Sequence, residues 1–153
     1  MEDFMLDYEL FFAVISGKVS SAINRRMYRD LRTAGLDITP EQWSVLMFLW
    51  QQDGVTQREI ADATYKDKPS ITRLIDNLER QGLLYRKQDN VDRRTNKIFL
   101  TQAGQDLHKS ARIATLGTMQ TALEGLSKEE IEQAQYLLKK VFANIQELET
   151  SNK

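Results

Sequence analysis

The fold is decided by residues 56–86, TQREIADATYKDKPSITRLIDNLERQGLLYR, where two short helical patterns lie close together in the chain. Thr56-Gln-Arg-Glu59 is a capping box, a helix start in which the threonine and glutamate side chains satisfy free backbone N–H groups. A second helix starts at Asp67 or Ser70 and ends near Gly82. Its inner side, at helical spacing, consists of Ile71, Leu74, Ile75 and Leu78.

A two-stranded ribbon is predicted after Gly82. The helical period gives way to a period of two, so residues 84–88 are expected to form one strand and residues 96–100 the returning strand, and residues 89–95 between them have turn chemistry. A capped helix, a tight connection, a second helix and a ribbon, in this order, form a winged helix-turn-helix. The second helix of such a unit enters the DNA major groove, and the ribbon contacts the backbone or the minor groove.

Long helices are predicted on both sides of this unit, so the fold class is mainly α. One amphipathic pattern runs from Phe4 to Leu31, and Thr39-Pro-Glu-Gln42 then caps a helix that stops at Asp53-Gly54. Another helix runs from about 101 to 123, and Ser127 caps the last one. The last helix has a heptad-like apolar seam, which should pack on something. The buried stripe expected after residue 40 is Trp43, Leu46, Met47 and Trp50.

Composition and charge narrow the class of protein. The 153 residues fit one compact domain, or one domain with an appended helical module. The chain has no cysteine, which excludes disulfides, zinc–thiolate sites and thiol catalysis. We expect no signal peptide and no membrane helix, because no apolar run of suitable length is present. Residues 66–97 carry nine basic and five acidic side chains, although the net charge of the chain is −1.

The outward face of the second helix carries candidate DNA-binding residues. A helical wheel over 68–80 places Thr72, Arg73 and Asn77 away from the apolar side, and Lys68 and Ser70 lie at the exposed N-terminal end. Short hydroxyls and a long arginine near a helix N-terminus suit base edges and phosphates. An ordinary solvated helix face has the same composition, so this pattern alone does not decide between the two.

Two adjacent arginines at the tip of the ribbon strengthen the DNA-binding hypothesis. Arg93 and Arg94 cannot cover core there, and guanidinium groups suit the negative potential of a narrow minor groove. We expect Asp92 to be an anchor that fixes the geometry of one of these arginines. Arg86 and Lys97 on the flanking strands are further candidate contacts. The alternative is a loop-tip salt bridge, which would contribute little.

These residues resemble the MarR (multiple antibiotic resistance) family of regulators. The resemblance rests on residues 56–86 and on DRRTNKIFLTQAG, residues 92–104, with its pattern of Asp-Arg-Arg, strand and Leu-Thr-x-x-Gly. It implies a cytoplasmic homodimer without a cofactor that binds a pseudo-palindromic operator in double-stranded DNA, usually as a repressor relieved by a small molecule. It also implies a recognition helix at 68–80 and a wing at 84–100. Asp92 and Arg94 match the family's acid–arginine pair, and Arg93 or Arg94 its minor-groove contact.

The resemblance further implies a DNA-binding lobe, residues 36–102, and a helical dimerisation region, residues 1–35 and 103–149. The expected dimer contacts are Phe4, Phe11, Ile15, Leu138, Val141, Ile145 and Leu148. A small aromatic or phenolic effector is expected near Tyr28, Arg29, Trp43 and Met47, although the aromatic residues and Met47 also suit a core-filling role. Members that sense peroxide through a thiol need a cysteine, so that mechanism is excluded here.

Two other classes of protein compete with a DNA-binding regulator. An enzyme is not expected, because His108 is the sole histidine and no phosphate loop, nucleophile elbow or metal-ligand cluster is present. A winged helix used only for protein contact is the remaining alternative. It would need an apolar outer face on 68–80, where the sequence has Lys68, Thr72 and Arg73. Repressors and activators share every residue discussed, so the sequence does not separate them.

Overall fold

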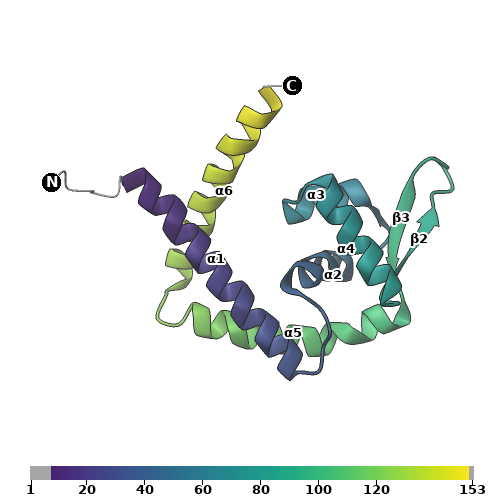
Figure 1. Ribbon diagram of the computed structural model, residues 1–153, viewed down its shortest axis with the longest axis horizontal. Coiled ribbons are helices and arrows are strands. Elements are labelled where there is room, and N and C mark those ends of the chain that lie inside the picture. Colours follow the sequence, from purple (N-terminus) through teal and green to yellow (C-terminus); the bar gives the residue numbers. More distant parts are fainter. Residues whose placement is uncertain (1–7, 152–153) are drawn as a thin grey trace. The chain divides into compact units, whose positions relative to one another are not determined.

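The computed structural model describes residues 8–151, and side chains from 11 to 148. Phe4, one of the expected dimer contacts, lies outside this range. The chain divides into two compact units, one ending at Thr118 and the other starting at Met119. The elements, in chain order (Figure 1), are α1 (Tyr8–Thr33), α2 (Pro40–Gln51), β1 (Val55–Thr56), α3 (Gln57–Thr64), α4 (Lys68–Arg80), β2 (Leu84–Gln88), β3 (Asn96–Leu100), α5 (Gln102–Ala122) and α6 (Lys128–Ser151).

The starts of α2, α3, α4 and α6 are the ones that the sequence predicts. Both capping boxes before α2 and α3 are formed, with Thr39 and Thr56 as the capping residues. Ser127 accepts the Glu130 N–H at 3.2 Å and starts α6 in the same way. The sequence allows α4 to start at either of two residues, and Asp67 is the cap, because its Oδ1 accepts the Ser70 N–H at 2.7 Å.

The expected two-stranded ribbon is part of a three-stranded antiparallel sheet in the order β1-β3-β2. Val55 pairs with Ile98, and Leu84 pairs with Leu100 on the other side of β3. The prediction was incomplete because β1 has two residues, too few for an alternating pattern. Gly54, just before β1, donates its N–H to the Ile98 carbonyl of β3 at 3.0 Å. Its φ is +73°, a backbone conformation that favours glycine.

The core of the first unit lies between α2, α3, α4 and the sheet, and one part of its prediction was wrong. On α2 the fully buried apolar residues are Val45, Leu46 and Leu49. Met47 is 39% exposed, and the two tryptophans are half-buried. The reason is that the packed face of α2 is turned toward Val45 and Leu49, so the larger side chains flank it. The other fully buried large apolar residues are Leu31, Ile38, Ile60, Ile71, Ile75, Leu78, Leu84 and Ile98.

A buried glycine joins the sheet to α5. A Cβ at Gly104 would lie 2.0 Å from the Leu83 carbonyl oxygen, so only glycine allows this approach. The Trp50 indole N–H donates to the Gly104 carbonyl at 2.9 Å, and the Thr101 hydroxyl donates to the Gly82 carbonyl at 2.6 Å. The glycine of the Leu-Thr-x-x-Gly pattern therefore fixes where α5 leaves the wing.

Candidate nucleic-acid interface

The outer face of α4 gathers three of the predicted contact residues. Lys68, Thr72 and Arg73 line one shallow hollow on this face, together with Pro69, Asp76 and Arg80. Lys68 and Arg73 are exposed, and among the described residues neither forms an ion pair. The helix therefore presents two long cations around a short side chain, an arrangement that suits a groove of DNA.

The two hydroxyls of this face are engaged within the protein. The Ser70 hydroxyl donates to Asp67 Oδ2 at 3.0 Å, and the Thr72 hydroxyl donates to the Lys68 carbonyl at 2.9 Å. The hydrogen bonds from the backbone N–H and hydroxyl of Ser70 hold the pKa of the Asp67 carboxyl below its ordinary value of 3.8. Each hydroxyl has thus used its one hydrogen, and what it can offer another molecule is a lone pair.

Asn77 does not join this group. Its Oδ1 accepts a hydrogen bond from Arg80 Nη2, and its side chain is half-buried. It lines a different hollow, with Tyr28, Asp37 and Gln42 among its neighbours. The helical wheel places Asn77 on the polar side of α4. That side borders two different hollows, one lined by Lys68 and Arg73 and the other by Asn77.

The wing tip is shaped by Asp92. Its carboxylate accepts the backbone N–H of Arg94 at 3.0 Å and the hydroxyl of Thr95 at 2.8 Å. Asp92 therefore holds the main chain of Arg94 in the turn, and among the described residues it does not pair with a guanidinium group. Asp92, Arg93 and Arg94 are all exposed. Among the side chains of residues 11–148 neither guanidinium has an acidic partner, so both remain free for an external anion.

Lys97 stands apart from the free cations of the wing. Its Nζ lies 2.9 Å from Asp89 Oδ2, across the hairpin. Asp89 also accepts the Val91 N–H at 2.7 Å. These two hydrogen bonds, first the one from Val91 and then the one from Lys97, lower the pKa of the Asp89 carboxyl. Lys97 therefore helps to close the hairpin, and its charge is largely balanced.

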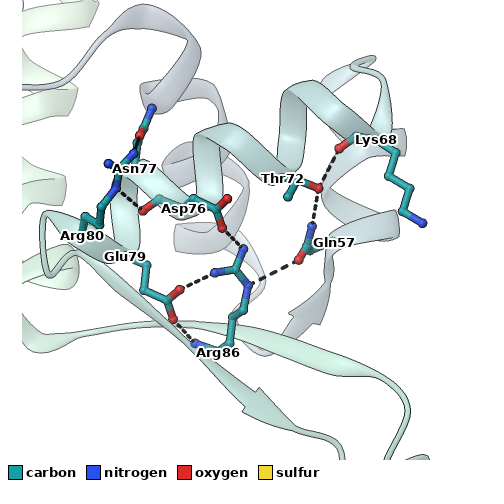
Figure 2. A network of polar contacts seen from close by, with 8 residues as sticks. All are labelled: Gln57, Lys68, Thr72, Asp76, Asn77, Glu79, Arg80 and Arg86. Carbon is teal, nitrogen blue, oxygen red and sulfur yellow. Dashed lines mark hydrogen bonds and ion pairs between the residues drawn. The ribbon is translucent and has the colours of Figure 1, made fainter.

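Arg86 has intramolecular partners on three sides (Figure 2). Its Nη2 lies 2.5 Å from Asp76 Oδ1, its Nη1 pairs with Glu79, and its Nε donates to Gln57 Oε1 at 3.4 Å. The side chain is only 21% exposed. The sequence suggested a DNA contact, but the structure places this guanidinium against α4 and α3. Gln57, which the sequence reasoning missed, completes the network by donating to Thr72 Oγ1 at 3.2 Å.

The residues expected around an effector do not lie together. Trp43 and Met47 line a hollow of about 320 Å³ between α2 and α5, with Trp50, Gln51, His108 and Arg112. Tyr28 lines the separate hollow near Asn77, and Arg29 lines neither. In the first hollow the Trp50 and His108 rings stack at 4.6 Å between centroids. The buried Trp43 Nε1–H has no hydrogen-bond partner among the described residues.

Apolar side chains are exposed on the long helices. On α1 Phe11 is 51% exposed and Ile15 is 42% exposed. The α6 residues expected at a dimer contact are exposed as well: Leu138, Val141, Ile145 and Leu148. Exposed apolar residues repeated along a helix mark a surface that a partner can cover.

Neither a metal site nor a membrane span is found in the part of the chain that the structure describes. No group of three or more metal-ligating side chains occurs in residues 11–148. No described helix combines the length and the apolar character that crossing a bilayer requires.

Comparison with known proteins places these features in a family. The profile of the MarR family matches residues 38–95, which cover α2 to the wing tip. The HTH-type transcriptional regulator TtmR of Methylorubrum extorquens (strain PA1) is 35% identical over 102 residues. The match covers 67% of this chain and 50% of TtmR, so this chain spans about half the length of that relative. The name of this relative denotes a regulator of transcription and not an enzyme.

Two solved structures share the fold over nearly their whole length. The crystal structure of a MepR–DNA complex from S. aureus has a TM-score of 0.78 at 33% identity and covers 88% of this chain and 97% of MepR. The transcriptional regulator SlyA has a TM-score of 0.81 at 25% identity and covers 93% of this chain and 99% of SlyA. The MepR structure is a complex with DNA, which identifies a DNA-bound protein of the same fold.

Proposed function

Since this chain belongs to the MarR family, we propose that it is a transcriptional regulator that binds double-stranded DNA as a homodimer. In this proposal α4 enters the major groove and the wing tip reaches the adjacent minor groove. The similarity to MepR, which was solved with DNA, supports this assignment at 33% identity. As the family resemblance implies, we place the protein in the cytoplasm and take repression as its mode of action.

The observation that carries the proposal is the contrast between free and paired cations. Arg86 and Lys97 are paired with carboxylates inside the lobe. Lys68 and Arg73 on α4, and Arg94 at the wing tip, are exposed and face no acid within ion-pair distance among the described residues. Unpaired cations on two projecting elements suit the phosphates and groove edges of one duplex.

A homodimer would cover the exposed apolar residues of α1 and α6. A stripe of this kind is a liability in an isolated chain, and a two-fold dimer with the same patch on both subunits is its commonest solution. Leu138 is 51% exposed, so Leu138→Asp removes apolar contact area without disturbing a core. We expect this variant to sediment as a monomer and to lose operator binding. Lys139→Asp, at the next position, is the matched control and should stay dimeric.

A small effector would bind in the hollow between α2 and α5. The hollow has the size of a small-molecule site and offers the stacked rings of Trp50 and His108 and the cation of Arg112. These groups suit an aromatic acid, whose carboxylate would pair with Arg112. Salicylate is a suitable probe in a thermal shift assay. Stabilisation of wild type and not of Arg112→Ala supports this site, and equal shifts in both would place the probe elsewhere.

The experiment that tests the proposed function is equilibrium binding to duplex DNA at several salt concentrations. We expect the logarithm of the binding constant to fall linearly with the logarithm of salt concentration, with a slope of about −0.9 per phosphate contact. Binding that is absent at low salt, or that shows no salt dependence, would favour the protein-interaction alternative.

A further inference from the structure

We propose that Arg86 is a positioning residue for DNA recognition: its guanidinium holds α4 at a fixed rotation relative to the wing and does not itself contact DNA. The inference rests on the proposed function, because it concerns how accurately α4 is presented to a duplex. Arg86 lies on β2, and its partners lie on α4 and α3. One side chain thus connects three elements of the candidate interface.

The geometry of the guanidinium makes it suited to fixing an orientation. It is planar and carries five N–H donors in a rigid fork. Asp76 and Glu79 are three residues apart on α4, which places them one above the other on the same helix face. Holding both carboxylates with one planar group restricts rotation of α4 about its axis as well as sliding along it. The backbone N–H of Arg86 also donates to Glu79 Oε1 at 3.1 Å, so the strand and the helix are joined twice.

The network continues to a residue on the DNA-facing side of α4. Arg86 Nε–H donates to Gln57 Oε1, and this orients the amide so that its Nε2 donates to Thr72 Oγ1 at 3.2 Å. The hydrogen of the Thr72 hydroxyl then points to the Lys68 carbonyl. The hydroxyl of Thr72 is therefore held on both sides, by Gln57 and by the Lys68 carbonyl (Figure 2). Besides one lone pair of the hydroxyl oxygen, the methyl group of Thr72 is left for contact with a base, and methyl groups pack on the thymine methyl in the major groove.

Charge balance gives the network a second effect. Asp76 lies in the hollow that Lys68 and Arg73 also line, so a free carboxylate there would repel phosphate. The guanidinium of Arg86 pairs with the Asp76 carboxylate and balances its negative charge. Its removal would therefore both loosen α4 and expose two acids, and a test has to separate these effects from the loss of a direct contact.

The test compares a variant that changes the arginine of the ion pairs with a variant that changes their two acids. Arg86→Lys keeps the charge but loses the planar fork. Asp76→Asn with Glu79→Gln leaves Arg86 intact and removes its two acidic partners. Lys87→Gln, the neighbouring exposed position on β2, controls for simple loss of a positive charge. The dissociation constants for a selected operator and for random duplex DNA are measured at several salt concentrations, and thermal unfolding checks that each variant is folded.

We expect Arg86→Lys and the Asp76→Asn/Glu79→Gln double variant each to reduce the ratio of operator to random affinity by about tenfold. The salt slope of Arg86→Lys on random DNA should equal that of wild type, and the affinity ratio of Lys87→Gln should be unchanged. A double variant that keeps the wild-type ratio overturns the inference, since a direct DNA contact by Arg86 would not need its acidic partners. A wild-type protein that does not discriminate operator from random DNA would instead overturn the proposed function itself.

Discussion

Asp92 Oδ1 accepts the backbone N–H of Arg94 at 3.0 Å, so the carboxylate binds the main chain of its neighbour and leaves the guanidinium exposed. The other oxygen, Oδ2, accepts the Thr95 hydroxyl. The acid of this acid–arginine pair therefore sets the shape of the turn, and the arginine is free at its tip. In the wing, Asp92 stabilises the turn, and Arg94 is the side chain available for binding.

Arg94→Ala should weaken DNA binding without unfolding the protein. The side chain is exposed, so the free energy of unfolding should change by no more than about 0.5 kcal/mol. Losing a groove or phosphate contact should cost about 1–3 kcal/mol of binding free energy, and Arg93→Ala should cost less. Fluorescence anisotropy with a labelled duplex measures the binding free energy of both variants. Arg58→Ala on α3, whose side chain is 91% exposed, is the control. Unchanged binding by the Arg93→Ala/Arg94→Ala double variant would remove the wing from the interface.

Arg73→Ala should relax sequence preference, whereas Lys68→Ala should weaken binding to all sequences alike. Arg73 is the long, forked side chain on the outer face of α4, and a bidentate contact to guanine contributes about 1–3 kcal/mol of discrimination. Lys68, at the start of α4, is placed for a phosphate contact, which mainly changes the salt slope. Competition between operator and random duplex separates the two effects. Full discrimination by Arg73→Ala would mean that another residue recognises the bases.

Two glycines of α5 should respond to the same substitution in opposite ways. Gly104→Ala brings a methyl group against the Leu83 carbonyl, which α5 can relieve only by moving from the wing. We expect a loss of about 1–3 kcal/mol or more in the free energy of unfolding. At Gly117 a Cβ meets nothing within 4 Å, so Gly117→Ala should stabilise by up to about 1 kcal/mol. Urea unfolding measures both, and equal effects would contradict the tight approach at Gly104.

Acid should weaken the start of α4. The pKa of the Asp67 carboxyl is lowered in the folded protein, so its contribution to stability is fully present above the unfolded value. The contribution is then lost as the pH falls through the lower, folded value. Asparagine also caps a helix but does not titrate. The difference in melting temperature between wild type and Asp67→Asn should therefore be constant near neutral pH and shrink below about pH 3.8. A difference that stays the same at low pH would contradict the assignment.

The parts of the fold that are predictable from the sequence depend on residues close together in the chain. A capping box needs residues three positions apart, so the starts of α2 and α3 follow from the local sequence alone. The inward face of α4 follows from its helical period: Ile71, Ile75 and Leu78 are buried as predicted, and Leu74 is half-buried at the edge of this face. Arg93 and Arg94 are exposed at the tip of a hairpin, as turn chemistry and strand alternation predict.

What the sequence did not reveal depends on residues distant in the chain. β1 is a strand only because β3 lies beside it. The partners of Arg86 come from positions 57, 76 and 79, and no local pattern distinguishes this arginine from the free arginines at the tip. Trp43 and Tyr28 were expected near one site as aromatic residues, but they line separate hollows.

The most direct test of the central claim, a homodimer that presents two α4 helices to one duplex, is selection of bound sequences from random double-stranded DNA, followed by footprinting. Two recognition helices related by a two-fold axis reach successive major grooves on one face of the DNA. The account therefore predicts an inverted repeat whose half-sites lie about 10 bp apart, centre to centre, both protected together. Enrichment of a single unsymmetric half-site, or no enrichment at all, would contradict it.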